Sequence, residues 1–409
     1  MSDTPELVSS STAAKPRLRG LTQDELVELT VAAGFPAFRG RQLFHWLHRK
    51  MARSLDEMKN LPVPYREWLA ANTVLGGLKD VVTVKVSQDG SYKFLFELED
   101  GRKVESVLMP DAKRTYWTQC LSSQVGCAVD CKFCVTGFNG FFRQMKVDEI
   151  VDQVLFARRH LMTEQPGSNY RNLVYMGMGE PLLNPDAVIK SIRLLTHNEG
   201  VDLSPRRVTV STSGIVPGMI QLAEAETGAC LALSLNAPNQ EERERIMPIT
   251  KKYPLADVLD VCRRYKFGKN KRVTFEYVLL AGINDTVDHA RQVAGLMKGM
   301  QCKINVIPFN PNPMLPFGRP ETEDVQAFVD VLGSQNFTVS VRWSKALDVD
   351  GACGQLAGQH RQRRGTRGLD APVAPTPVEP SQAQFAHALG DLDFFAPVAA
   401  EAAEDGDEE

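Results

Sequence analysis

Between about residues 115 and 344 the chain alternates short, strongly apolar runs with longer amphipathic stretches. The longer stretches repeat apolar residues at helical spacing, whereas the short runs are typical of buried strands. Five of these helical stretches are VDEIVDQVLFARRHLM, NPDAVIKSIRLLTH, LADVLDVCRRYKF, TVDHARQVAGLMKGM and TEDVQAFVDVLGS. The strand-like runs are TYWTQCLS, NLVYMGMG, RVTVSTSG, ACLALSLNA, RVTFEYVLL, KINVIPF and FTVSVRWS. Repeated strand–helix units predict an α/β fold whose parallel sheet curls toward a barrel, with functional residues in the loops after the strands. Six or seven units are recognisable, fewer than in a complete eightfold barrel.

The N-terminal region has a different pattern. GLTQDELVELTVAAGF and RGRQLFHWLHRKM predict helices, with Thr22 and Asp24 near a helix start, and SLDEMKNLPVPYREWLAAN predicts a further pair. Residues 81–110 then alternate apolar and polar positions across two Asp-Gly turn signals, which indicates a β-meander. We therefore expect a disordered N-terminus over 1–17, a small helical accessory domain with the meander over 18–100, and an α/β core over 101–368.

Charge is distributed unevenly along the chain. The formal net charge is −3, but residues 371–409 contain nine acidic and no Lys or Arg residues, so the preceding part carries +6. The composition of 369–409 predicts a disordered acidic tail. The segment QHRQRRGTRG before it has four arginines, a pattern typical of phosphate contacts: Arg361, Arg363, Arg364 and Arg367. No apolar run approaches the roughly 18 residues of a membrane span, and no signal peptide is recognisable, so we expect a cytoplasmic protein.

Three cysteines, Cys127, Cys131 and Cys134, lie within SSQVGCAVDCKFCVTG. In a reducing compartment such a cluster indicates metal binding or catalysis more than a disulfide framework. A structural zinc site needs four ligands, and no second Cys pair of suitable spacing follows. A [4Fe-4S] cluster held by three thiolates leaves one iron open to a small molecule that carries an amine and a carboxylate. Cys230, Cys262 and Cys302 stand alone, and we interpret them as small buried side chains.

The spacing Cys-x3-Cys-x2-Cys after a first barrel strand resembles the radical S-adenosylmethionine (SAM) enzymes. Together with GMGEPLLN, RVTVSTSG, SLNAPN, VIPFNP and GACGQLAG, it resembles the RlmN/Cfr family of RNA methyltransferases over about residues 18–359. The resemblance implies a partial (β/α)6 radical SAM barrel with an N-terminal accessory RNA-binding domain. It also implies a [4Fe-4S] cluster on the three cysteines and a SAM pocket lined by Gly179, Glu180, Ser211, Ser234, Leu235, Asn236 and Asn310. Asn236 stands where many relatives have His.

The resemblance further implies a reaction that uses two SAM molecules per turnover and two more cysteines. C2 of adenine is electrophilic, so a direct polar transfer from the SAM sulfonium finds no nucleophile. In the family, one SAM methylates a cysteine that corresponds to Cys353, and a radical made from the second SAM activates that methyl group for addition to C2. Cys120 then corresponds to the thiol that releases the product by forming a disulfide with Cys353, and Glu105 to the base that removes the C2 proton.

The expected substrates are an adenosine of 23S rRNA at the peptidyl transferase centre and adenosines in a subset of tRNAs. We expect a monomer that receives electrons from a donor such as flavodoxin. Two alternatives stay open: a Cfr-type enzyme that methylates C8 of adenosine with the same paired cysteines, and a non-catalytic iron–sulfur or zinc RNA-binding protein.

Overall fold

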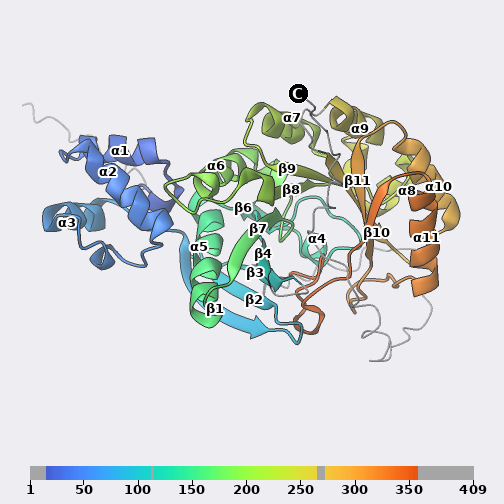
Figure 1. Ribbon diagram of the computed structural model, residues 1–409, viewed down its shortest axis with the longest axis horizontal. Coiled ribbons are helices and arrows are strands. Elements are labelled where there is room, and N and C mark those ends of the chain that lie inside the picture. Colours follow the sequence, from blue (N-terminus) through green and yellow to red (C-terminus); the bar gives the residue numbers. More distant parts are fainter. Residues whose placement is uncertain (1–14, 112–114, 265–271, 358–409) are drawn as a thin grey trace, which may run out of the picture.

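In the computed structural model, which describes residues 15–111, 115–264 and 272–357, ten strands form one sheet in the order β1-β2-β3-β4-β7-β8-β9-β10-β11-β12 (Figure 1). From β4 onward the neighbouring strands are parallel. These strands are β4 (Tyr116–Cys120), β7 (Asn169–Tyr175), β8 (Val208–Thr212), β9 (Cys230–Ser234), β10 (Val273–Leu279), β11 (Cys302–Pro308) and β12 (Thr338–Val341). The predicted α/β class with a parallel sheet is confirmed, and each predicted strand-like run overlaps one of these strands.

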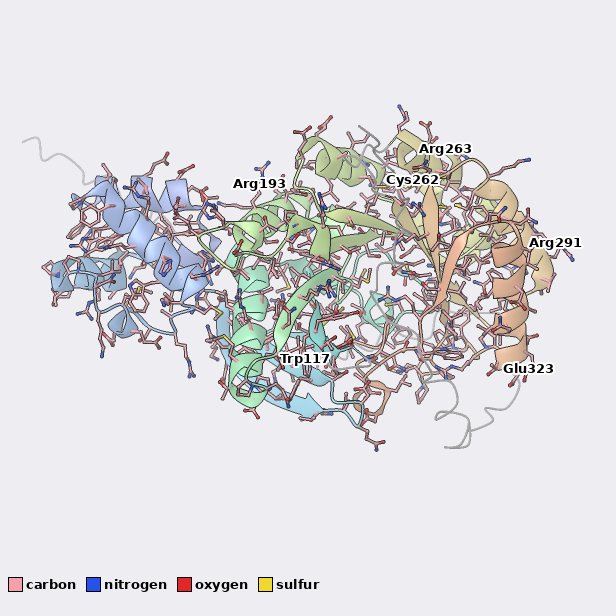
Figure 2. The ribbon with its side chains drawn as sticks, viewed as in Figure 1. Trp117, Arg193, Cys262, Arg263, Arg291 and Glu323 are labelled. Carbon is pink, nitrogen blue, oxygen red and sulfur yellow. The ribbon has the colours of Figure 1, made fainter. Side chains whose placement is uncertain are left out.

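Helices connect the parallel strands and cover the outside of the sheet (Figure 1). The five predicted from the sequence are present: α5 (Val147–Glu164), α6 (Pro185–Thr196), α9 (Leu255–Arg264), α10 (Val287–Leu296) and α11 (Thr322–Ser334). On α9, Cys262 is buried while the adjacent Arg263 is exposed, as an amphipathic helix requires (Figure 2). Two shorter helices, α7 (Val216–Glu224) and α8 (Gln240–Ile246), lack a predicted counterpart because α7 carries Pro217 and Gly218 and α8 is almost entirely polar.

The β-meander is also confirmed, and it belongs to the same sheet as the parallel strands. β1 (Leu78–Val86), β2 (Tyr92–Leu98) and β3 (Lys103–Pro110) pair antiparallel with one another, and β3 pairs antiparallel with β4. Phe94 and Phe96 of β2 each pack edge-on against Phe156 of α5, with ring centroids 5.4 Å apart. The domain boundary predicted at residue 100 therefore falls in the β2–β3 turn, inside a continuous sheet.

The N-terminal helices α1 (Gln23–Ala32), α2 (Ala37–Phe44) and α3 (Val63–Asn72) lie beside the barrel (Figure 1). Thr22 caps α1 in a capping box with Glu25, so the predicted start is correct. A π-helical turn, His45–Arg49, extends α2. The second predicted pair of helices is wrong in its first member, because only a 3-10 turn (Leu55–Glu57) precedes α3.

Buried ion pairs fasten the N-terminal region to α5. Asp152 of α5 accepts from the Arg19 guanidinium at 2.7 Å and from the Gly77 amide at 2.7 Å. Arg19 follows Leu18 in the short turn Leu18–Gly20, and both Arg19 and Asp152 are buried. Two buried charges with matched partners fix the relative position of their elements more strongly than exposed pairs do.

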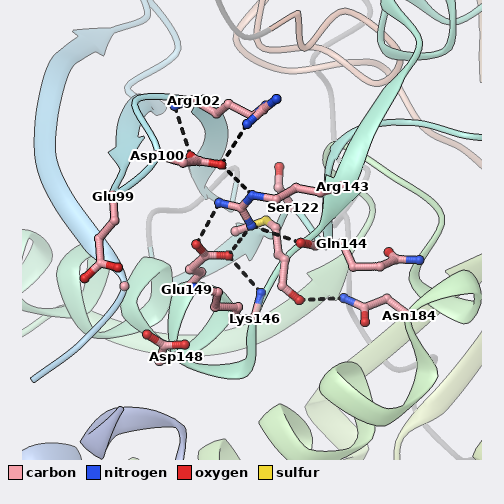
Figure 3. A network of polar contacts seen from close by, with 12 residues as sticks. Glu99, Asp100, Arg102, Ser122, Arg143, Gln144, Lys146, Asp148, Glu149 and Asn184 are labelled. Carbon is pink, nitrogen blue, oxygen red and sulfur yellow. Dashed lines mark hydrogen bonds and ion pairs between the residues drawn. The ribbon is translucent and has the colours of Figure 1, made fainter. Parts of the chain in front are cut away.

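Arg143 joins the meander to the start of α5. Its guanidinium lies between Asp100 of the β2–β3 turn and Glu149 in the first turn of α5, with contacts of 2.7–2.9 Å (Figure 3). The two cations Arg143 and Arg102 hold the pKa of Asp100 well below its usual range. Arg143 belongs to β6 (Phe141–Gln144), the strand that follows the cysteine loop, so this network also positions that loop.

The acidic tail 369–409 and the four arginines of 361–367 lie outside the described residues, as do residues 1–14. Within the described part of the chain, no helix is both long and apolar enough to span a membrane.

Candidate active site

The residues predicted to bind a cofactor gather where the parallel strands end. Cys120 is the last residue of β4 and Ser234 the last of β9, and Ser211 is the penultimate residue of β8. Gly179 and Glu180 follow β7, and Asn310 lies two residues beyond β11. Because neighbouring strands are parallel, these positions share one edge of the sheet, as the sequence predicts.

The three clustered cysteines lie in a loop between β5 (Gln124–Gly126) and α4 (Val135–Asn139), and β5 pairs with β6 behind them. The amide of Cys127 donates to the carbonyl of Gly140 at 2.9 Å, which closes the loop. Gly126 has φ +78°, and a Cβ there would lie 1.9 Å from the Gly140 carbonyl oxygen. A side chain at this position is therefore excluded by backbone that cannot move aside.

The thiols of the cysteine loop affect one another's ionisation. Burial raises the pKa of Cys127 and of Cys131, and the neighbouring thiols of the loop raise it further. Within the described residues, however, no three His, Cys, Asp or Glu side chains converge on one metal position. Three thiols in one loop are donors of the kind that an iron–sulfur cluster takes, so the residues present fit the cluster that the sequence predicts.

The loop after β7 is packed tightly against β5. Gly179 has φ +100°, and a Cβ there would lie 2.4 Å from the Gln124 side chain. The Glu180 carboxylate is buried and accepts from the amides of Ser213 at 2.7 Å and Leu182 at 3.0 Å. Burial raises the pKa of Glu180 although these amides oppose the shift. Glu180 thus ties the β7 loop to the β8 loop.

Ser211 hydrogen bonds to one member of a buried ion pair, Glu276 with Arg342, which the sequence analysis does not identify. Its hydroxyl donates to Glu276 of β10 at 3.1 Å, and the other Glu276 oxygen contacts Arg342, which follows β12, at 3.3 Å. The signal was available, since a glutamate within VTFEYVL and an arginine at the end of TVSVR are charges in otherwise apolar runs.

The two asparagines of the predicted pocket already have protein partners. Asn236 has φ +57°, a left-handed conformation that Asn tolerates well, and its side-chain oxygen accepts from the Val278 amide at 2.9 Å. Asn310 is buried and hydrogen bonds with Ser344 and Arg319. In this arrangement the side chain of Asn236 orders the loop after β9.

Cys120 and Cys353 line the same cavity, of about 40 Å³, together with Glu276 and Arg342. Burial raises the pKa of Cys120, with a further contribution from Cys353, while Arg342 opposes the shift. Cys353 has access to water, but desolvation by the cavity wall still raises its pKa, and Arg342 again opposes the shift. The two thiols thus face a common space beside a buried cation.

The Cys353 loop is docked on α4, directly after the last clustered cysteine. The Val135 amide donates to the Gly354 carbonyl at 2.7 Å, and the Thr136 hydroxyl donates to the Leu356 carbonyl at 2.5 Å. The Asn139 amide group donates to the carbonyl of Ala357 at 3.0 Å. Three hydrogen bonds from one short helix therefore place Cys353 beside the cysteine loop.

Glu105 lies on the other side of this loop. Its carboxylate forms a buried ion pair with Lys93 at 3.0 Å and accepts from the Ala357 amide at 2.9 Å. Lys93 also donates to the Asp350 carbonyl at 2.9 Å. Both side chains line a second, open cavity of about 540 Å³, which contains neither Cys120 nor Cys353 in its wall. Glu105 thus holds the loop that carries Cys353.

All eight cysteines are free thiols in the structure. The structure therefore does not support the disulfide expected between Cys120 and Cys353. Cys262 and Cys302 are buried, as predicted, whereas Cys230 is only partly buried.

Comparisons with known proteins agree with this site. Residues 121–293 match the family model of the radical SAM superfamily, and residues 17–75 match that of the ribosomal RNA large subunit methyltransferase N-terminal domain. A crystal structure of a radical SAM methyltransferase from Sphaerobacter thermophilus covers 83% of this chain and 99% of its own, with 41% sequence identity and a TM-score of 0.79. The fold and the site therefore define a radical SAM methyltransferase.

The curated relatives narrow this class. The dual-specificity RNA methyltransferase RlmN of Desulfotalea psychrophila is 44% identical over 345 residues, which cover 83% of this chain and 94% of the relative. That of Nitratidesulfovibrio vulgaris strain Hildenborough is 46% identical over 360 residues, which cover 87% and 98%. The chain belongs to the RlmN family of radical SAM RNA methyltransferases. Membership of this superfamily implies a [4Fe-4S] cluster and SAM.

Proposed function

We propose that this enzyme methylates C2 of adenosine in 23S rRNA at the peptidyl transferase centre and in a subset of tRNAs, through a methylated cysteine. The observation that carries the proposal is the shared cavity of Cys120 and Cys353 beside the cysteine loop. The thiol that carries the methyl group, Cys353, and the thiol that releases the product, Cys120, must act at the same sulfur–carbon bond. A shared cavity allows this. The dual specificity is that of the RlmN relatives.

In this proposal, Cys127, Cys131 and Cys134 hold the cluster. Gly179, Glu180, Ser211, Ser234, Leu235, Asn236 and Asn310 lie around the SAM pocket, and Glu180 accepts from the SAM ammonium in addition to its two backbone donors. When bound, the cluster and SAM supply a radical that removes a hydrogen atom from a methyl group. The hydrogen-bonded Asn236 and Asn310 contribute by fixing the pocket loops.

The protein side chains carry the covalent part of the reaction. The Cys353 thiolate displaces the methyl group from one SAM, which leaves as S-adenosylhomocysteine, and the resulting thioether supplies the carbon that joins adenine C2. Arg342 favours the thiolate of both cysteines by its charge. After addition to C2, the adduct would give one electron back to the cluster, and Glu105 takes the C2 proton once its Lys93 ion pair opens. The Cys120 thiolate then attacks the Cys353 sulfur, the departing carbon takes up a proton to become the methyl group, and a disulfide is left.

RNA is proposed to enter over the open cavity lined by Lys85, Lys93 and Glu105, where Lys85 is exposed and the Lys93 charge is paired with Glu105. The partners are then 23S rRNA and tRNA, with electrons from a donor such as flavodoxin to a cytoplasmic monomer. A reducing cytoplasm would also keep the free thiols of the site reduced between turnovers.

Methylation at C8 is the second candidate, because a paired-cysteine site serves both positions. The test is nucleoside mass spectrometry of rRNA and tRNA after reaction with the reconstituted enzyme, and of RNA from cells that lack the protein. We expect 2-methyladenosine in both RNAs from the reaction and its loss in the cells. Formation of 8-methyladenosine alone would replace the proposal with the C8 reaction.

A further inference from the structure

Arg243 of α8 is a completely buried arginine in the site, and the predicted cofactor residues do not include it. Its guanidinium donates to the carbonyls of Ser213 at 2.6 Å, Ser234 at 2.9 Å and Leu235 at 3.0 Å. A fourth hydrogen bond goes to the Thr250 hydroxyl at 2.7 Å. Four of the five N–H groups of an arginine are thus used, three of them on the loops after β8 and β9.

These contacts join a larger network. The Ser213 backbone donates its N–H to Glu180 and accepts at its carbonyl from Arg243, so the backbone of one residue connects both charged side chains. The network therefore runs from the loop after β7 through the loop after β8 to the loop after β9. These are three of the loops that form the proposed SAM pocket.

The charge of Arg243 lacks a carboxylate partner. The four groups that accept from it are neutral, and within the described residues no Asp or Glu forms an ion pair with it. A buried cation without a directly bonded counter-charge is costly, and Cys131 and Glu180 act on this one only through space. Burial lowers the pKa of Arg243 to about 10, opposed first by the Cys131 thiol, so the side chain stays charged at neutral pH.

The cysteine loop lies against the same helix. The Lys132 amide, next to Cys131, donates at 2.9 Å to the carbonyl of Ile246, the last residue of α8. Cys131 and Phe133 also pack on an apolar cluster that contains Ile246 and Met247. A cluster held by three thiolates carries a net negative charge that grows on reduction, and a nearby fixed cation stabilises the reduced form.

We propose that Arg243 is a positioning residue with two separable actions: its charge compensates the iron–sulfur cluster and favours cluster reduction, and its planar fork fixes the SAM-binding loops. This inference rests on the proposed cluster site at Cys127, Cys131 and Cys134. Lysine keeps the charge but cannot reproduce the fork, and glutamine keeps some hydrogen bonds but loses the charge. Two substitutions therefore separate the two actions.

The experiment uses the full-length protein with reconstituted cluster. The midpoint potential is measured by titration with electron paramagnetic resonance detection, and SAM affinity by equilibrium dialysis. Arg243→Gln should lower the potential, whereas Arg243→Lys should keep it near the wild-type value and weaken SAM binding by about tenfold. Arg19→Gln removes another buried arginine, one paired with Asp152 away from the site, and should lower stability without moving the potential.

Each outcome has a distinct meaning. A wild-type protein that takes up no cluster contradicts the proposed function itself. An Arg243→Gln protein with a loaded cluster and the wild-type potential overturns the role of the charge, and tight SAM binding by Arg243→Lys overturns the role of the fork. If Arg243→Gln takes up no cluster, restored uptake in Arg243→Lys supports the charge and absent uptake in both overturns it.

Discussion

Cys120 and Cys353 line the same small cavity, although Cys120 ends the first parallel strand and Cys353 lies beyond the last one. Arg342 lines this cavity as well. Their roles can be separated by experiment. Cys120→Ala should accumulate a covalent protein–RNA adduct, because the methyl carrier still reacts while the resolving thiol is missing. The adduct should appear as a slowly migrating band on a denaturing gel that collapses on ribonuclease treatment.

Cys353→Ala is the matched control for this prediction. It should bind cluster and SAM yet form neither adduct nor methylated RNA, and the double variant should resemble it. Normal turnover by Cys120→Ala would remove this cysteine from the mechanism, and an adduct in the double variant would assign the link to a different residue.

Replacing one cysteine of the cysteine loop should cause a selective loss of iron. Cys131→Ala should remove most of the bound iron and abolish reductive SAM cleavage, because one corner of the cluster loses its thiolate. Cys302→Ala removes a buried thiol on β11, away from the cysteine loop, and should retain both. Iron analysis and 5′-deoxyadenosine formation measure the two properties, and full iron content in Cys131→Ala would contradict the assignment.

Alanine substitutions at two glycines with similar φ angles distinguish backbone strain from steric exclusion of a side chain. Gly126 and Gly101 have φ +78° and +76°, but only at Gly126 does a Cβ meet backbone, at 1.9 Å. Gly101→Ala should therefore cost about 1 kcal/mol of unfolding free energy and leave cluster uptake intact. Gly126→Ala should disrupt the cysteine loop and lose the iron. Equal iron content in both variants would show that the Gly126–Gly140 approach does not position the cluster.

The burial of His48 predicts that the free energy of unfolding depends on pH. It is fully buried, and neither ring nitrogen has a hydrogen-bond partner among the described residues. Burial lowers its pKa from 6.5 to about 3, so below pH 6.5 the unfolded chain binds a proton that the folded protein does not. Stability is then lost as the pH falls, by about 2 kcal/mol between pH 7 and pH 5.

The measurement is urea unfolding of wild type and His48→Leu at both pH values. The variant should lose less stability on acidification by about that amount. An identical pH dependence in the two proteins would show that His48 is not responsible. The comparison between variants matters more than either absolute value, because other groups also titrate in this range.

The sequence predicts most of the barrel because its strands are short apolar runs separated by long amphipathic helices. It does not reveal α8, since QEERERI has no apolar periodicity, and so Arg243 is not recognisable as buried. The meander was recognised from its alternation, but its continuity with β4 depends on tertiary pairing that no local pattern encodes.

In the candidate site, the sequence reveals the motif residues but not the partners that restrain them. Motif positions such as Cys127 and Glu180 were found by spacing and resemblance, and the structure brings them to one edge of the sheet. The partners that restrain them were not found: the Glu276–Arg342 pair and the Lys93–Glu105 pair join residues far apart in sequence. Such pairs become visible only when the strands are assembled.

The attachment of the N-terminal helices through Asp152 bears on how RNA of different shapes can be accepted. Arg19 and Gly77 both bind this one carboxylate, so the chain is fastened to α5 before α1 begins and again after α3 ends. A domain anchored at both ends cannot swing to follow its substrate. Under the proposed function, an rRNA and a tRNA must then each bring the target adenosine to a similar separation from the N-terminal helices, so the shape of the RNA contributes to its selection.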